Sequence, residues 1–205
     1  MIRAVLFDLD GVVRHFDHDP DLENRHGLEQ GLLAQIAFAS PLIDEVTTGR
    51  ITRAEWIARI GARTSTSAAE EWGRTPFRVD AEMTELADEL RAAGVICAIL
   101  TNGTDTIDAE AAQSGLTTHF DRIFNSADIG HAKPDRRAFV HVMESLHLSA
   151  ERIFFTDDSP AKLVGANELG IKTHAFTDVH TLRVALHAAG LPIPHPGNTA
   201  VTRTA

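Results

Sequence analysis

Short, continuous apolar runs alternate with longer amphipathic stretches over most of the chain. Continuous runs without alternating polar positions are typical of strands that are buried on both faces of a sheet. A first strand that ends at Phe7 is followed by predicted strands at 95–100, 122–125, 152–156 and 171–175, and by predicted helices at 80–93, 105–114, 136–146, 160–169 and 180–189. This alternation predicts right-handed crossovers and an α/β fold with a central parallel sheet.

The segment 17–76 interrupts the alternation. Residues 14–21 are polar and rich in His and Asp, so we expect a loop there and no strand. From about residue 22 to 74 the apolar residues follow helical spacing, and Thr52 with Glu55 forms a capping box. We therefore predict a small helical insertion, 17–76, within a discontinuous core made of 1–16 and 77–205. The segment 192–205 holds three of the eight prolines and is expected to be a flexible tail.

Composition narrows the range of partners. The 205 residues are 43% hydrophobic, which suffices for a globular core, and their formal net charge of -10 argues against a nucleic-acid binder. No apolar run approaches the length of a membrane span and no charged-then-apolar leader opens the sequence, so we expect no membrane partner and a cytoplasmic location. Cys97, the single cysteine, lies within an apolar run and is expected to be a buried structural thiol.

Polar residues stand where the predicted strands end. The motifs are Asp8-Leu9-Asp10-Gly11 after the first strand, Thr101-Asn102-Gly103 after the second, Lys133-Pro134 in the loop after the third, and Asp157-Asp158-Ser159 after the fourth. Each motif has an ordinary structural explanation as a turn, a helix cap or a solvated charge. Parallel strands, however, deliver their carboxyl ends to one edge of the sheet, which is where open α/β sheets bind their ligands.

Together these motifs indicate phosphate chemistry. Converging carboxylates repel one another unless a hard cation lies among them, and carboxylate and carbonyl oxygens are the ligands that Mg²⁺ prefers. A hydroxyl and backbone N–H groups at a helix start can bind the oxygens of a phosphate monoester. A lysine can neutralise its charge, and a carboxylate can attack the phosphorus in line.

The order and setting of the four motifs resemble the haloacid dehalogenase-like (HAD) hydrolase superfamily, on its phosphatase side. The resemblance implies a Rossmann-like three-layer core and a helical C1-type cap, here 17–76. It implies that Asp8 is the nucleophile that becomes an aspartyl-phosphate, and that Asp10 is the general acid and base. It further implies that Thr101, Asn102 and Lys133 bind the phosphoryl group. Asp8, the Asp10 backbone carbonyl and Asp158 would ligate Mg²⁺, with Asp157 in an outer or water-mediated position.

One position departs from the family pattern. Members with a paired acid in the last motif often place Asn or Asp four residues after the second acid, whereas this chain has Lys162. Lysine cannot accept a hydrogen bond. We expect Lys162 to point outward into a salt bridge and the metal site to be supported otherwise, or more weakly.

A small phosphorylated metabolite, such as a sugar phosphate, is the substrate class that the short cap favours. Arg14 and His15, directly after the first motif, are our candidates for contacts that set substrate specificity.

Several alternative functions remain. A phosphomutase shares the first half-reaction. A 2-haloacid dehalogenase would use Asp8 but needs neither Asp10 nor a metal. A phospho-receiver module places its acidic pair after the first strand and has no inserted cap. A catalytically weak binding protein is favoured only by Lys162.

Overall fold

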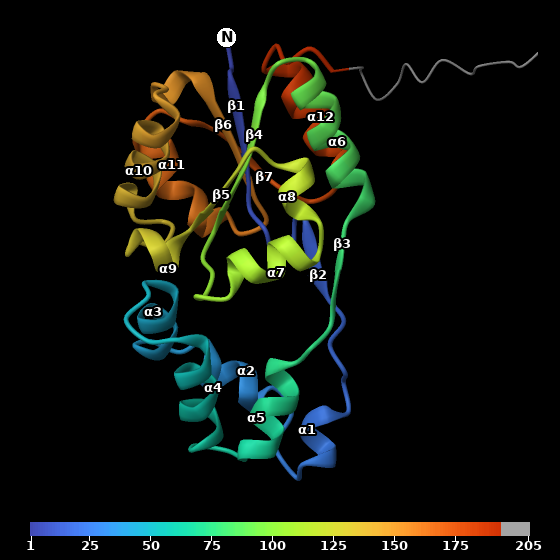
Figure 1. Ribbon diagram of the computed structural model, residues 1–205, viewed down its shortest axis with the longest axis vertical. Coiled ribbons are helices and arrows are strands. Elements are labelled where there is room, and N and C mark those ends of the chain that lie inside the picture. The colour runs from blue at the N-terminus through green and yellow to red at the C-terminus, as the bar shows by residue number, and fades with distance from the viewer. Residues whose placement is uncertain (194–205) are drawn as a thin grey trace, which may run out of the picture.

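The computed structural model describes residues 1–193 and contains a five-stranded parallel sheet with helices on both faces (Figure 1). The five strands of this sheet are β1 (Ala4–Phe7), β4 (Ile96–Thr101), β5 (Arg122–Asn125), β6 (Ile153–Asp157) and β7 (Lys172–Ala175). They lie in the order β5-β4-β1-β6-β7. The predicted α/β class, with its Rossmann-like three-layer core, is confirmed.

The sheet separates two layers of helices. One face is covered by α6 (Ala81–Ala92), α7 (Ile107–Gln113), α8 (Leu116–His119) and α12 (Val179–Ala188), and the other by α9 (Ser126–Ile129), α10 (Arg136–Leu146) and α11 (Val164–Glu168). Successive side chains of a strand point to opposite faces. In β1, Val5 and Phe7 accordingly pack into the first layer and Ala4 and Leu6 into the second, and all four are fully buried.

The central place of β1 explains how the motifs meet. Its neighbours are β4 and β6, with Phe7 paired to Ile99 on one side and to Thr156 on the other. All three strands are parallel, so their carboxyl ends reach the same edge. The strands that carry Asp8, Thr101 and Asp157 are therefore adjacent.

A separate group of helices lies beyond this edge of the sheet (Figure 1). These helices are α1 (Leu22–Arg25), α2 (Leu32–Ala37), α3 (Leu42–Thr47), α4 (Arg53–Gly61) and α5 (Thr66–Gly73). They bury their own cluster of apolar side chains, which includes Leu33, Val46 and Ile60. The capping box at the start of α4 is present as predicted, since Thr52 accepts from the Glu55 backbone and Glu55 accepts from the Thr52 backbone.

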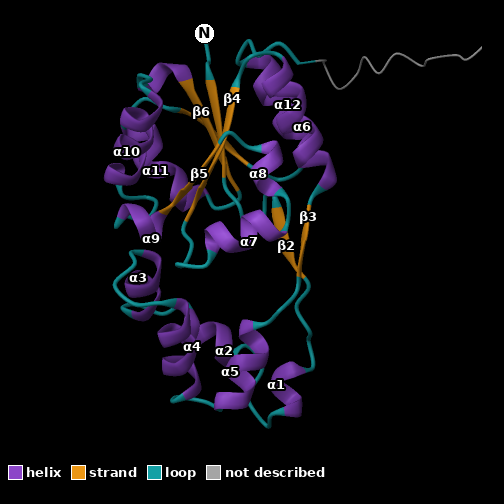
Figure 2. Cartoon of the chain, viewed as in Figure 1, coloured by secondary structure: helices purple, strands orange, loops and turns teal. Residues whose placement is uncertain are grey.

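The prediction of a loop without a strand at 14–21 is wrong. Residues Arg14–Phe16 form β2, which pairs antiparallel with β3 (Phe77–Val79) as a two-stranded sheet (Figure 2). The pairing partner is more than 60 residues away in sequence, so a polar segment without hydrophobic alternation gave no local sign of it. This small sheet joins both ends of the helical segment to the core.

Smaller differences concern helix ends and the tail. The predicted helix 160–169 is divided into a 3-10 turn, η2 (Pro160–Leu163), and α11, and another 3-10 turn, η1 (Ala150–Arg152), precedes β6. Residues 194–205 of the predicted tail lie outside the described residues, whereas Ile193 packs into the core. Among residues 1–193, no helix has the length and apolar character needed to cross a bilayer.

Candidate active site

Lys133 joins the first and last motifs at the edge of the sheet. Its Nζ donates to Asp8 Oδ1 and to Asp157 Oδ2, both at 2.7 Å, and all three side chains are buried. The same Nζ lies 5.1 Å from the centre of the Phe155 ring. A buried ammonium needs such partners, because desolvation of an unpaired charge costs several kcal/mol. The sequence prediction that these three side chains converge is met by this geometry.

Asn102 holds Lys133 in place through the backbone. The Asn102 side chain donates from Nδ2 to the Lys133 carbonyl and accepts at Oδ1 from the Lys133 N–H, both at 2.8 Å. Both polar atoms of this side chain are therefore engaged with the lysine loop. Asn102 therefore positions the backbone of Lys133, while Thr101 is buried at the end of β4.

The two acids of the last motif differ in environment. Asp157 is buried, accepts from Lys133 at one oxygen and from the Ser159 N–H at the other, and so has both oxygens occupied. Burial raises the pKa of Asp157, the negative charge of Asp8 raises it further, and Lys133 opposes both effects. Asp158 is exposed at the mouth of the site. Asp158 thus has the freer carboxylate of the pair.

A divalent cation fits this set of carboxylates. One oxygen each from Asp8, Asp157 and Asp158 lie within 4.8 Å of one another. Asp8 Oδ2 is buried and accepts no hydrogen bond from any described residue, which is a costly state for a carboxylate oxygen. Gly11, at φ +89°, allows Asp158 to approach, because a Cβ there would collide with Asp158 Oδ2. The unpaired buried oxygen of Asp8 and the nearby carboxylate of Asp158 are oxygen ligands of the kind that Mg²⁺ prefers.

Lys162 does not point outward, so that prediction is wrong. Its Nζ lies 3.7 Å from Asp8 Oδ2, and its side chain is 33% exposed. Burial lowers the pKa of Lys162, but the combined negative charges of the four motif acids outweigh burial and raise it above the ordinary value. The ammonium therefore faces the carboxylate oxygen that is left without a hydrogen bond.

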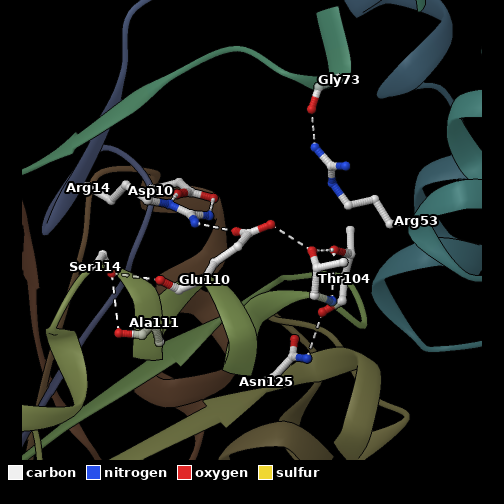
Figure 3. A network of polar contacts seen from close by, with 10 residues as sticks. Asp10, Arg14, Arg53, Gly73, Thr104, Glu110, Ala111, Ser114 and Asn125 are labelled. Carbon is white, nitrogen blue, oxygen red and sulfur yellow. Dashed lines mark hydrogen bonds and ion pairs between the residues drawn. The ribbon is translucent and has the colours of Figure 1, made fainter. Parts of the chain in front are cut away.

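Asp10 is held by Arg14. Arg14 donates from Nε to Asp10 Oδ1 at 2.5 Å and from Nη2 to Asp10 Oδ2 at 3.0 Å, while Nη1 donates to Glu110 Oε2 at 2.6 Å (Figure 3). The guanidinium also lies 4.9 Å from the Phe16 ring centre and 4.8 Å from that of Phe77. At 3% exposure Arg14 is committed to Asp10, and a contact between Arg14 and substrate stays a prediction.

The contacts continue from Glu110 to the residues just before helix α7. The Oε1 atom of Glu110 accepts from Thr106 Oγ1 at 2.6 Å, and Thr106 Oγ1 lies 2.9 Å from Thr104 Oγ1. Asn125 Nδ2 then donates to the Thr104 carbonyl (Figure 3). His15, the other specificity candidate, contacts Asp80 at 3.2 Å, at the start of α6. Both candidates are thus engaged by core residues.

Sequence reasoning missed Glu110 and the direction of Lys162. Glu110 lies 96 residues from Arg14, and nothing local connects the two. Lys162 did carry a signal, because side chains of a helical turn tilt back toward its N-terminus. A lysine in the first turn after β6 therefore reaches back toward the end of that strand.

The helical segment contacts the core beside this site. The Arg53 N–H donates to Asp105 Oδ1 at 2.7 Å, and Gly49, directly after α3, approaches the Ala127 carbonyl so closely that a Cβ would collide with it. An open cavity of about 470 Å³ lies between α3 and the loop that carries Lys133. Its lining includes the charged residues Asp44, Arg50, Lys133, Asp135 and Arg137, together with the imidazole of His131.

Comparison with known proteins shows the family of this chain. The model of the haloacid dehalogenase-like hydrolase family matches residues 2–170. A sesquiterpene phosphatase of Aspergillus oryzae is 28% identical over 86% of this chain and 90% of its own length. Bifunctional epoxide hydrolase 2 of Sus scrofa is 27% identical over 88% of this chain, which spans only 37% of that protein.

Solved structures share the fold. A HAD family enzyme of Bacteroides thetaiotaomicron, solved with magnesium and inorganic phosphate, superimposes with a TM-score of 0.70 at 23% identity. The match covers 89% of this chain and 99% of that one.

Proposed function

The chain belongs to the haloacid dehalogenase-like hydrolase family, and from this premise we propose that it is a phosphoric monoester hydrolase that works through an aspartyl-phosphate on Asp8. The observation that carries the proposal is the buried contact of Lys133 with Asp8 and Asp157 at 2.7 Å, beside an Asp8 oxygen without a hydrogen bond. A lysine held against this carboxylate can also compensate the charge of a phosphoryl group that the carboxylate attacks. One relative of this chain, the sesquiterpene phosphatase of Aspergillus oryzae, is named as a phosphatase, which supports the proposal.

In the first half-reaction, an Asp8 oxygen forms a bond to phosphorus as the ester P–O bond breaks. The electron pair of that bond leaves with the alcohol oxygen, and the Asp10 carboxyl gives its proton to this oxygen. Lys133 compensates the negative charge of Asp8 and of the transferring group. Thr101 and the backbone N–H groups that follow it bind the phosphoryl oxygens.

In the second half-reaction, Asp10 is a carboxylate and takes a proton from water. The water oxygen bonds to phosphorus, the bond from phosphorus to Asp8 breaks, and the Asp8 carboxylate is restored with inorganic phosphate released. Arg14 keeps the Asp10 carboxylate oriented between these steps through its two hydrogen bonds.

Asp8, Asp158 and the Asp10 backbone carbonyl would hold Mg²⁺, with Asp157 acting through Lys133. When bound, the ion supplies positive charge that lowers the repulsion between an anionic nucleophile and an anionic substrate. The open Asp8 oxygen and the close approach that Gly11 allows support this assignment.

We propose a small phosphorylated metabolite as substrate, with the helical segment 17–76 as the cap that covers it. A cavity of about 470 Å³ is within the range that holds a small organic molecule. Arg50 and His131 line this cavity from the cap side and the core side, so they are proposed, in addition to Arg14 and His15, as candidates for contact with the organic part. A cytoplasmic location and the absence of a nucleic-acid or membrane partner remain part of the proposal.

The alternative reaction within the family is displacement of halide from a 2-haloacid. Halide leaves without a proton, so that reaction gives Asp10 no role, although Asp10 is held by a buried arginine. A phosphomutase would have to exclude water from the aspartyl-phosphate. These alternatives are separated by product: inorganic phosphate, halide or a phosphate isomer.

The test measures phosphate release from p-nitrophenyl phosphate and a panel of sugar phosphates, with Mg²⁺ and with EDTA. We expect Mg²⁺-dependent release that is lost in Asp8→Asn, with circular dichroism to establish that the variant is folded. Asp108→Asn, at an exposed position of α7, serves as the matched control and should keep the hydrolysis of p-nitrophenyl phosphate. Release that survives Asp8→Asn, or chloride release from 2-chloropropionate instead, would contradict the proposal.

A further inference from the structure

We propose that Lys162 is a built-in competitor of the divalent cation, an ammonium that binds the Asp8 oxygen in the metal-free protein and is displaced when Mg²⁺ enters. The inference rests on the proposed function for the identity of the ion. It concerns how tightly this chain binds that ion, which can be measured without any substrate.

The geometry points to competition at a single oxygen. Asp8 Oδ1 already accepts from Lys133 Nζ and from the Leu9 N–H, so this oxygen is committed. Asp8 Oδ2 is buried, accepts no hydrogen bond from any described residue, and faces Lys162 Nζ at 3.7 Å. At that distance the ammonium compensates the charge of the oxygen without a direct hydrogen bond. A metal ion bound to Oδ2 would meet the same ammonium.

In the metal-free protein, a cation at this place reduces the repulsion between the carboxylates of the site. Asp8, Asp157 and Asp158 bring three carboxylates to one place, and Lys133 neutralises only part of their charge. Without a further cation the remaining repulsion would act against folding. Lys162 supplies that cation from the first turn after β6, and at 33% exposure its side chain can swing into solvent when it is displaced.

The energetic consequence is a weakened metal site. An ammonium beside a divalent ion repels it in proportion to the product of the two charges, and moving the ammonium away from Asp8 Oδ2 gives up its attraction to that oxygen, so either response opposes metal binding. A side chain without charge at position 162 removes this repulsion, and we expect Mg²⁺ to bind about tenfold more tightly or more. The ammonium therefore sets the Mg²⁺ concentration at which the enzyme is loaded.

The experiment titrates Mg²⁺ into substrate-free protein by calorimetry. Lys162→Met removes the charge without adding a metal ligand, and Lys162→Asn removes the charge and adds an amide oxygen. Lys172→Met, an exposed lysine of β7, is the matched control. We expect both Lys162 variants to bind Mg²⁺ at least about tenfold more tightly than the wild type, and Lys172→Met to bind it as the wild type does.

Thermal unfolding is a second readout, in which the effect of Lys162→Met on stability differs between EDTA and saturating Mg²⁺. In EDTA, Lys162→Met should unfold at a lower temperature than the wild type, because the site loses a compensating cation. At saturating Mg²⁺ it should gain more in unfolding temperature than the wild type does, because a ligand that binds the folded state stabilises it according to its affinity.

Three outcomes would overturn the inference. These are equal Mg²⁺ affinity in the wild type and Lys162→Met, tighter binding in Lys162→Asn alone, or no Mg²⁺ binding by any of the proteins. Tighter binding in both Lys162 variants supports it even where no phosphate is released from p-nitrophenyl phosphate, so failure of the proposed reaction and failure of this inference are distinguishable.

Discussion

Arg14 donates two hydrogen bonds to the Asp10 carboxylate, from Nε at 2.5 Å and from Nη2 at 3.0 Å. The two residues are four positions apart, on either side of the turn between β1 and β2. A bidentate arginine restricts the orientation of a carboxylate far more than a single lysine contact does. The pair therefore couples the proposed general acid to the small sheet that leads into the helical segment.

Replacement of Arg14 by Lys should lower kcat while leaving KM almost unchanged. Lysine keeps the positive charge but cannot make two parallel hydrogen bonds to Asp10. We expect a loss of about tenfold to a hundredfold, below the full contribution of general acid and base catalysis. Steady-state kinetics with p-nitrophenyl phosphate would measure this loss of kcat. The pH dependence of kcat should change as well as its maximum value.

The control is Arg78→Lys, at an exposed position of β3 in the same two-stranded sheet. It should behave as the wild type. If Arg14→Lys instead raises KM selectively for some substrates, Arg14 contacts the substrate directly, and its role in positioning Asp10 is refuted.

Gly11→Ala should weaken Mg²⁺ binding. The added Cβ would collide with Asp158 Oδ2, and the φ of +89° strains any residue with a side chain. The collision moves a proposed ligand, for which we expect a loss of about tenfold or more in affinity. Calorimetric titration with Mg²⁺ measures this loss directly.

Gly31→Ala is the matched control for backbone strain. Gly31 has a φ of +82°, but a Cβ there meets no atom within 4 Å. Both variants should lose about 1–2 kcal/mol of folding free energy from the left-handed conformation, and only Gly11→Ala should lose metal affinity. Equal Mg²⁺ affinity in the two variants would remove Asp158 from the proposed ligand set.

Cys97 should resist alkylation in the native protein. Its thiol is fully buried, and burial raises its pKa to about 12, with a smaller contribution from Asp121. The thiolate is the reactive form, so little reaction with iodoacetamide is expected at pH 8. Mass spectrometry should show one added group in urea and none in native buffer. Rapid labelling of the folded protein would contradict the buried environment described here.

His174 should make the protein less stable in mild acid. Burial lowers its pKa from the ordinary 6.5, and Asp178 only partly opposes this shift. The unfolded chain then binds a proton that the folded protein does not, so the free energy of unfolding falls as the pH drops from 6.5 to the lowered pKa and is constant below it. Denaturant unfolding at several pH values measures the slope.

The comparison for this prediction is His174→Gln, which keeps a polar group near Thr156, the hydrogen-bonding neighbour of His174 at 3.2 Å. Other groups titrate in both proteins, so the difference between the two stability curves isolates the histidine. A difference that does not vary with pH over this window would show that His174 keeps an ordinary pKa in the folded state.

The sequence by itself determined the α/β alternation, the parallel sheet and the acids at its edge. Short continuous apolar runs that are bounded by turn residues favour strands buried on both faces, so their ends, and Asp8 and Asp157 with them, were predictable. The capping box at Thr52 and the buried environment of Cys97 likewise follow from interactions within a few residues.

Only the tertiary structure decided which groups meet. Arg14 and Glu110 are 96 residues apart, β2 and β3 pair across the whole helical segment, and Asn102 binds the backbone of Lys133 from another strand end. These contacts depend on strand order and on the path of the chain between strands, which local propensities do not encode. For Lys162, the tilt of the first turn after β6 is a local signal, but the buried Asp8 oxygen that it faces is left without a hydrogen bond only by the tertiary structure.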